Sequence, residues 1–324
     1  MRYVVGVDLG GTNIAVGTVA TDGSALLGYV VRDTPVAAGP DAVVDEIVRL
    51  IKESVTAAQR EQAGLDVAGV GIGAPGPLNT AQGIVRLAPN LGWHDMPLRD
   101  RVSAGAGIPA ALDNDANCAT LGEWWLGAAQ GARIVVGITI GTGVGGGVVI
   151  DGKLFHGASD VAGEIGHTSI DSTGRRCKCG NYGCLEAYTS GPAIAARAIE
   201  EVESGEPSSL RDLVKGDLKR ITAQLVYQAA HDGDRLASQV VRETARFLGT
   251  GIANIVNILN PEVVVVSGGV TLAGDQLFDP LRREVGRRAF KPAVEACRIV
   301  PGILTGKAGI YGAVAAFKSQ RGIA

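Results

Sequence analysis

Hydrophobic and polar positions at the start of the chain predict a β-hairpin. Residues 3–9 and 14–20 are two short runs rich in valine, with Asp22-Gly23 as the turn after the second run. The tip between the runs reads Asp8-Leu9-Gly10-Gly11-Thr12-Asn13. Glycines let backbone N–H groups approach an anion, so this tip can bind a phosphate, and the carboxylate before it can hold Mg²⁺ through water. A tight turn without a ligand fits the same residues.

Further along the chain, the pattern predicts alternating strands and helices, hence an α/β protein. A helix begins at Pro40-Asp41, and its apolar face recurs at helical spacing through residues 43–55. The other expected helices are residues 193–203, 221–230, 237–259 and 308–317, with a polar segment at 204–219. The expected strands are residues 67–72, 110–112, 134–140, 148–150, 262–266 and 298–304.

A weak internal repeat predicts two halves of the same topology. Val5-Gly6-Val7-x-x-Gly10 corresponds to Val136-Gly137-Ile138-x-x-Gly141, and both hairpins close with Asp-Gly. The second hairpin carries the tip Gly141-Thr142-Gly143 and further glycines up to residue 147. Two glycine-rich tips that each bind phosphate would suit a nucleoside triphosphate.

Polar or glycine-rich loops follow several of the predicted strands, where α/β proteins commonly bind ligands. The loops are residues 73–79, which include Gly76 and Pro77, the turn around Asn90, and Ser267-Gly268-Gly269. Each of the first two also fits an ordinary turn. At residues 113–117, three further Asn or Asp side chains accompany the one that a helix N-cap requires. The excess indicates ligand contacts, with one carboxylate available as a general base.

Residues 162–186 combine a histidine with three of the chain's five cysteines. Cys177, Cys179 and Cys184 lie within eight residues, ten positions after His167. Three thiolates and one imidazole form a common structural zinc site with no position left open for water. Reduced thiols on a glycine-rich loop are the alternative, because Cys-x-Cys is tighter than the usual spacing. Glu164 and Glu186 flank these residues, so a bound metal would fix where both carboxylates point.

Composition narrows the class of protein. The 324 residues allow two domains, and 46% hydrophobic with 19% charged residues excludes a disordered chain. A net charge of −3 gives no sign of a nucleic-acid or membrane partner. The sequence contains neither an apolar run of membrane-spanning length nor the apolar core of a signal peptide. Clustered cysteines in odd number favour metal over disulfides and a reducing compartment, so we expect a cytoplasmic protein.

Along essentially its whole length, the chain resembles the ROK family of bacterial sugar kinases and repressors, and within it most closely the glucokinases. Asp8–Asn13 resembles the first phosphate motif, Gly141–Gly143 the second, and Ser267–Gly269 the adenosine motif. Asn114-Asp115 resembles the sugar and catalytic pair. The stretch from Glu164 through His167 and the cysteines to Glu186 resembles the sugar and zinc signature, and its combined spacing is highly specific.

The resemblance implies an actin-like ATPase fold in which two ribonuclease-H-like domains flank a nucleotide and sugar cleft. Residues 1–117, with a C-terminal helix at about 305–324, would form a small domain, and residues 118–304 a large domain carrying the zinc loop. The sugar would be bound by Gly76, Pro77, Asn90, Asn114, Asp115, Glu164, His167 and Glu186. His167 would use one ring nitrogen for zinc and the other for a sugar hydroxyl.

The resemblance further implies phosphorylation of a hexose, with glucose favoured, by ATP and Mg²⁺, and with Asp115 as general base. It also implies a homodimer or homotetramer and a structural Zn²⁺. Fructose, mannose, N-acetylmannosamine or another N-acylhexosamine as substrate, and polyphosphate as donor, stay open. A sugar-sensing repressor is disfavoured, because the phosphate hairpin begins at Tyr3 and leaves no room for a helix-turn-helix before it.

Overall fold

The protein is described here by a computed structural model that covers residues 2–323. The chain divides into two compact units. The first comprises the residues up to Gly137, Gly147–Gly163 and those from Ile303 onward, and the second comprises Ile138–Gly146 and Glu164–Gly302.

The first unit is built on a five-stranded sheet in the order β3-β2-β1-β4-β8. β1 pairs antiparallel with β2 and β2 with β3, whereas β4 lies parallel to both β1 and β8. The strands are β1 (Arg2–Leu9), β2 (Asn13–Ala20), β3 (Leu26–Asp33), β4 (Asp66–Ala74) and β8 (Ala110–Asn114). In β1, Val5 and Val7 join one buried cluster and Val4 joins another, because successive side chains of a strand point to opposite faces.

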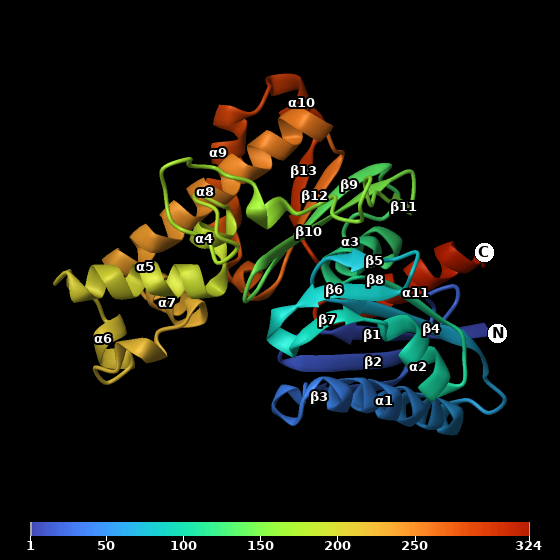
Figure 1. Ribbon diagram of the computed structural model, residues 1–324. Coiled ribbons are helices and arrows are strands. Elements are labelled where there is room, and N and C mark those ends of the chain that lie inside the picture. The colour runs from blue at the N-terminus through green and yellow to red at the C-terminus, as the bar shows by residue number, and fades with distance from the viewer. Residues whose placement is uncertain (1, 324) are drawn as a thin grey trace. The chain divides into compact units, whose positions relative to one another are not determined.

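Helices cover both faces of this sheet, as Figure 1 shows. On one face, α1 (Pro40–Glu61) packs on β2 and β3 and against α2 (Leu98–Ala106). On the other, α11 (Ala308–Arg321) packs on β1 and β4 and against α3 (Asp115–Leu126). A small antiparallel sheet of β5 (Leu78–Asn79), β6 (Ile84–Ala88) and β7 (Trp93–Met96) adds to the α1 side, where its Val85 and Trp93 are buried. The C-terminal helix therefore completes a core that the N-terminal strand begins.

The second sheet repeats the strand order of the first. Its order is β11-β10-β9-β12-β13, so in both sheets the third, second, first, fourth and fifth strands follow one another. The strands are β9 (Ile134–Ile140), β10 (Val144–Ile150), β11 (Lys153–Leu154), β12 (Val263–Ser267) and β13 (Arg298–Pro301). The boundary between the units falls within β9 and β10. The prediction of two halves with one topology is thus confirmed.

The second unit also holds most of the helices of the later chain. α8 (Arg235–Leu259) packs against α5 (Gly191–Glu203), α7 (Ala223–His231) and α9 (Asp275–Arg288). Shorter helices are α4 (Glu186–Thr189), α6 (Leu210–Leu213) and α10 (Lys291–Ala296). α8 ends where the sequence predicts, because Asn260 adopts a left-handed conformation with φ of 45° and a proline follows it.

Two predicted boundaries differ from the structure. β10 begins at Val144, four residues before the predicted strand, because its glycines extend the ladder instead of forming a longer turn. The sequence analysis expects residues 118–304 in the larger domain, whereas the compact units place residues 118–137, with all of α3, and residues 147–163 in the first unit. α3 belongs there because it packs against α11. The division into functional domains stays a prediction.

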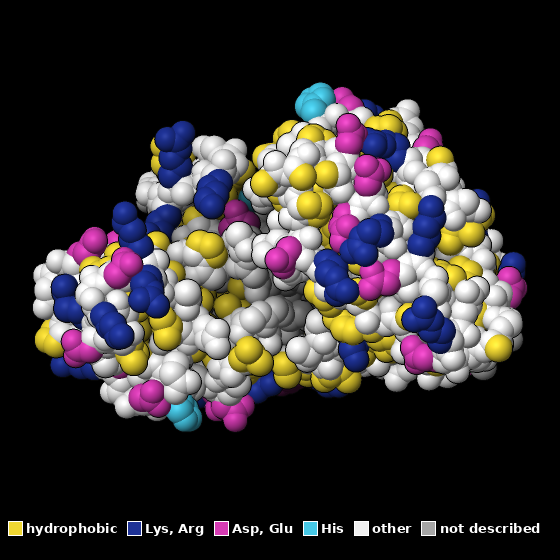
Figure 2. Space-filling model, turned by 90° about the horizontal axis from the view of Figure 1, so that it is seen from below, with side chains coloured by type: hydrophobic (Ala, Val, Ile, Leu, Met, Phe, Trp, Pro, Cys, Tyr) yellow, Lys and Arg dark blue, Asp and Glu magenta, His cyan; other side chains and the backbone are white. Residues whose placement is uncertain are grey.

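The surface agrees with the small net charge. On the face that Figure 2 shows, basic and acidic side chains are interspersed, and neither sign gathers into a large patch. Among the described residues, no helix has both the length and the apolar character that crossing a membrane requires.

Candidate functional site

The first predicted phosphate tip is a closed turn between β1 and β2. Gly10 N–H donates to the carbonyl of Asn13 at 2.9 Å, and Thr34, just after β3, donates from its backbone to Thr12 O at 2.7 Å. The Thr34 hydroxyl also donates to Gly10 O at 2.8 Å. Gly11, Thr12 and Asn13 are exposed, and Asn13 begins β2. The neighbouring strand therefore fixes the tip and leaves its outer backbone facing solvent.

Asp8, just before this tip, is largely enclosed. Burial, with a smaller contribution from the charge of Asp115, raises the pKa of its carboxyl to about 7. The enclosure depends on Gly309 in the first turn of α11, since a Cβ there would overlap the Asp8 carboxylate. Gly309 carries no motif that the sequence alone identifies, because its partner lies 301 positions earlier in the chain. Asp8 is thus placed to respond to a nearby cation.

The polar cluster at residues 113–117 forms the junction between β8 and α3. Asn114 is the N-cap, and its side-chain oxygen accepts from Ala116 N at 2.9 Å and Asn117 N at 3.1 Å. Asp113 and Asn117 are buried, and Asn117 Nδ2 donates to Asp113 Oδ1 at 3.1 Å. The excess of polar residues is therefore partly structural, which corrects the prediction of ligand contacts for these two. Asn114 and Asp115 are partly exposed.

Several candidates in the first unit lie near one another. Asn114 Nδ2 donates to the carbonyl of Gly76 at 3.4 Å, next to Pro77. A Cβ on Gly11 would lie 3.5 Å from the Cβ of Asn90. The fully buried thiol of Cys118 has its pKa raised well above the ordinary value, first by burial and then by the charges of Asp113, Asp8 and Asp115. The first phosphate tip, a base candidate and four sugar-site candidates, Gly76, Pro77, Asn90 and Asn114, are therefore grouped in one region of the first unit.

The second unit contains a cavity of about 510 Å³ between its own glycine tip and its helices. Gly141, Thr142 and Gly269 line it, as three of the predicted nucleotide residues. Ser267 ends β12. Gly268 adopts φ of 103°, which favours glycine, and a side chain there would also overlap the backbone of Ile140. The other lining residues come from helices that no motif identifies, among them Pro192, Ala195, Gln224, Tyr227 and Leu272. Its size and partly apolar lining suit a nucleoside.

The four predicted zinc ligands converge in the second unit. The ligand atoms of His167, Cys177, Cys179 and Cys184 all lie within 4.8 Å of one another. Cys179 Sγ is 3.7 Å from Cys184 Sγ, and Cys177 Sγ is 3.9 Å from His167 Nδ1. These distances fit the edges of a tetrahedron around one ion, so the donor set suits zinc in both chemistry and arrangement. Nδ1 faces the sulfurs, and Nε2 lies 4.0 Å from Glu164 Oε2.

The carboxylate of Glu186 connects this cluster to the second glycine tip. Glu186 begins α4, and its Oε2 accepts from Val144 N at 2.9 Å, at the start of β10. Its other oxygen lies 3.7 Å from Cys177 Sγ. A Cβ on Gly143 would stand 2.6 Å from Glu186 Oε2. The zinc-loop carboxylate is therefore anchored to the second glycine tip, a connection that motif spacing does not reveal.

Comparisons with known proteins show that the chain is similar to members of the ROK family. A family model described as ROK family matches residues 4–320. A glucokinase of Thermotoga maritima is 38% identical over 320 residues, 98% of each chain. A xylose repressor of Caldicellulosiruptor bescii is 36% identical over 266 residues, 82% of this chain and 66% of that protein. A ROK family glucokinase of Streptomyces griseus, crystallised with glucose and AMPPNP, has a TM-score of 0.82 and 36% identity over 96% of this chain and 98% of its own. The predicted actin-like fold is confirmed by this likeness.

Proposed function

The chain belongs to the ROK family, and from this premise we propose that it phosphorylates a hexose, glucose first, at the 6-hydroxyl with ATP as donor. One observation carries the proposal. Asp8 in β1 pairs with Gly73 in β4, and a Cβ on Gly73 would lie 3.5 Å from the Cα of Asp115 in the first turn of α3. A base candidate and a cation-steering candidate therefore meet beside a glycine tip. Phosphoryl transfer needs these groups together.

ATP would be held mainly by backbone groups. The exposed N–H groups around Gly11 and Thr12, and those of Gly141–Gly143, would bind phosphate oxygens. The cavity of about 510 Å³ beside Gly269 would take the adenosine. Mg²⁺, when bound, would supply positive charge to the phosphates, and Asp8 is the residue that would hold it through water.

The hexose would be held by the side chains of Asn90, Asn114, Glu164, His167 and Glu186 and by the backbone at Gly76-Pro77. With the hydroxyl positioned, the Asp115 carboxylate would accept its proton as oxygen attacks the γ-phosphorus. Fixing the sugar converts the attack into a nearly unimolecular step, which is the main gain that binding offers.

The role of zinc would be structural. His167, Cys177, Cys179 and Cys184 would hold the ion with all four positions filled, which leaves no site for water chemistry. His167 Nε2 would stay available for a sugar hydroxyl, because Nδ1 is the nitrogen that faces the sulfurs.

Replacing the base tests the mechanism. Asp115→Asn keeps the size of the side chain and removes its basicity, so we expect kcat to fall by ~10²-fold or more. Sugar affinity, measured by isothermal titration, should change by less than about three-fold, because an amide can still bond to hydroxyls. Near-normal kcat in this variant would leave Asp115 as a helix-terminal residue without a catalytic role.

A substrate panel tests the specificity. Glucose, fructose, mannose and N-acetylmannosamine, each with ATP or polyphosphate, should give the highest kcat/KM for glucose with ATP. A higher value for another pair would replace glucose or ATP in the proposal. The likeness to a xylose repressor favours one further assay, xylose binding without phosphorylation. The cytoplasmic location and the dimer or tetramer stay predictions.

A further inference from the structure

His156 is paired with Asp113, the residue directly before the candidate catalytic pair Asn114-Asp115. None of the sequence motifs described above includes His156. Its Nε2 lies 2.8 Å from Oδ2 of Asp113, whose side chain is only 1% exposed. Hydrogen bonding to this carboxylate raises the pKa of His156 above the ordinary histidine value. Because a carboxylate oxygen accepts, the Nε2–H of the imidazole is the donor to this buried carboxylate of the first unit.

Asp113 transmits this contact to the turn that carries Asp115. Its Oδ1 accepts from Asn114 N at 2.9 Å and from Asn117 Nδ2 at 3.1 Å, while Oδ2 accepts from His156. Asn114 in turn caps α3 through two backbone N–H groups. Without His156, a buried negative charge would keep two donors from its own turn and lose the one that comes from outside it. Asp113 would then rotate toward water, and the turn would shift with it.

His156 is held from its own side as well. Ala162 N donates to His156 O at 3.1 Å, and Asp160 Oδ2 accepts from both the backbone and the hydroxyl of Thr80, at 2.9 and 3.1 Å. The segment after β11 is thus anchored independently of Asp113. A donor on an anchored segment can fix the position of its acceptor.

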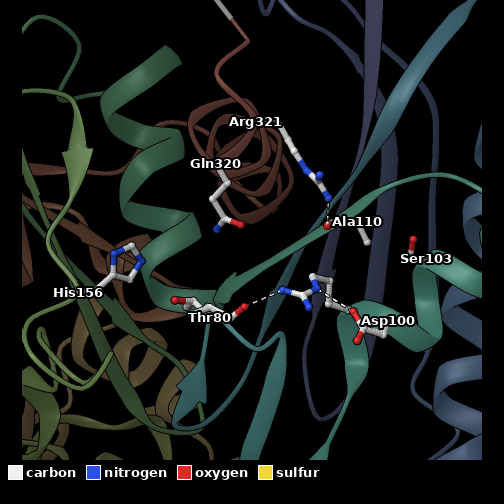
Figure 3. Close-up of a pocket in the computed structure, with 9 residues that line it drawn as sticks. Thr80, Asp100, Ser103, Ala110, His156, Gln320 and Arg321 are labelled. Carbon is white, nitrogen blue, oxygen red and sulfur yellow. Dashed lines mark hydrogen bonds and ion pairs between the residues drawn. The ribbon is translucent and has the colours of Figure 1, made fainter.

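The imidazole is also reachable from solvent. Figure 3 shows His156 at the side of a cavity of about 600 Å³, with Arg321 and Gln320 of α11 and Asp100 of α2 around the same space. The side chain of His156 is 29% exposed. A small molecule that enters this cavity can therefore occupy the place of a deleted imidazole.

We propose that His156 is a positioning residue for phosphoryl transfer, which holds Asp113 and thereby the Asn114-Asp115 turn in its reactive geometry. The inference rests on the proposed function, because it assigns Asp115 the role of base. The inference predicts an effect on kcat and not on substrate affinity, because His156 contacts Asp113 and is not one of the predicted substrate-binding residues. A displacement of about 1 Å at a reacting group can cost up to ~10²-fold in rate, so a smaller displacement gives an expected loss of about ten-fold.

The test compares His156→Ala, His156→Gln and a matched control. His94→Ala removes a histidine that is also paired with an aspartate, Asp95 at 3.2 Å, but on the exposed surface of the same unit. We expect His156→Ala to lower kcat about ten-fold with the KM values within about three-fold. His156→Gln retains an N–H donor and should recover part of the lost kcat. His94→Ala should behave as wild type.

Added imidazole gives the decisive readout. It should raise kcat of His156→Ala in a saturable manner, and leave wild type and His94→Ala unchanged. A structural role would lower the melting temperature of His156→Ala without moving kcat, and that result would overturn the inference. So would an equal loss of kcat in His156→Ala and His156→Gln together with no rescue of the alanine variant. If His156→Ala does not fold, His156→Phe, which keeps a ring but has no N–H donor, takes its place, and a wild-type kcat for that variant contradicts the inference. A wild-type protein that phosphorylates no sugar refutes the proposed function itself.

Discussion

Asp8 shows how much a single side chain depends on residues that are remote in the sequence. Its position after a strand and before Gly10 and Gly11 predicts a role at a phosphate tip. The same sequence cannot predict that Gly309 closes over the carboxylate or that Asp115 lies near it. The result is a carboxyl whose pKa is raised to about 7, which the local sequence gives no reason to expect.

Replacing Asp8 should therefore change how stability depends on pH. The unfolded carboxyl titrates near its ordinary value of 3.8 and the folded one near 7. As pH rises between these values, the unfolded state releases a proton that the folded state retains, so the free energy of unfolding falls. Above about 7 the loss is complete. Asp8→Asn does not titrate, so its stability relative to wild type should be greater at pH 8 than at pH 5.

Urea unfolding of the metal- and nucleotide-free proteins at both pH values measures this difference. Asp22→Asn is the matched control, because hydrogen bonds from Ser24 lower the pKa of this exposed carboxyl. Asp22 is therefore ionised in both the folded and the unfolded chain over that pH range. Its difference from wild type should not change between pH 5 and 8. If the difference between Asp8→Asn and wild type were also the same at pH 5 and pH 8, Asp8 would be as readily ionised in the folded chain as in the unfolded one.

At the scale of elements, the sequence predicts that four residues of the loop from Glu164 to Glu186 cluster together, but not how the loop is attached to the rest of its unit. The His and Cys types, with their spacing, predict one metal cluster, and the four ligand atoms do converge. The contact of Glu186 with Val144 joins the loop to a strand 42 positions earlier. Periodicity could not reveal it, because Val144 falls within a run of glycines that predicts a turn. The small sheet β5-β6-β7 was missed for a related reason, since its short strands are separated by turn residues.

Removing the Glu186 side chain should affect substrates more than metal. Loss of a charged acceptor that faces a buried hydroxyl costs ~1.5–3 kcal/mol, about one to two decades in affinity. We expect Glu186→Ala to keep full zinc content by elemental analysis and to raise the KM of the sugar about ten-fold or more. The KM of ATP should rise less, through the Val144 N–H that loses its acceptor.

Glu200→Ala serves as the comparison for Glu186→Ala. Its carboxylate pairs with Arg175, which belongs to the same loop but lies on its exposed side. This variant should leave both KM values unchanged. If Glu186→Ala likewise left the sugar KM unchanged and only lowered the melting temperature, Glu186 would be a structural residue at the start of α4.

At the scale of the whole molecule, the repeat between residues 5–10 and 136–141 predicts two sheets with one topology, and the common strand order confirms it. The repeat could not predict the division into compact units. The first unit recruits α11 from the far end of the chain, and α3 belongs with it because their apolar faces pack together. Such a long-range pairing leaves no local pattern in the sequence. It also makes the first unit a discontinuous structure of three segments.

The division into units places two probes in different parts of the molecule. Trp93, Trp124 and Trp125, the chain's three tryptophans, all belong to the first unit, whereas the four metal-site residues belong to the second. Tryptophan emission therefore reports unfolding of the first unit. Far-ultraviolet circular dichroism reports both units, because α4–α10 lie in the second unit and α1, α2, α3 and α11 largely in the first.

Chelating the metal should separate these two signals on heating. Metal binding to a folded site stabilises the unit that contains it, so its removal should lower the melting temperature of the second unit. We expect the chelated protein to lose circular dichroism in an earlier step that leaves tryptophan emission nearly unchanged, and then to show a second transition near the original temperature. Added Zn²⁺ should restore a single transition, and Mg²⁺ should not.

If emission and circular dichroism shifted together by the same amount, the cluster would stabilise the chain as one cooperative whole. An unchanged melting curve after verified removal of metal would show that the cluster does not stabilise the fold through a metal.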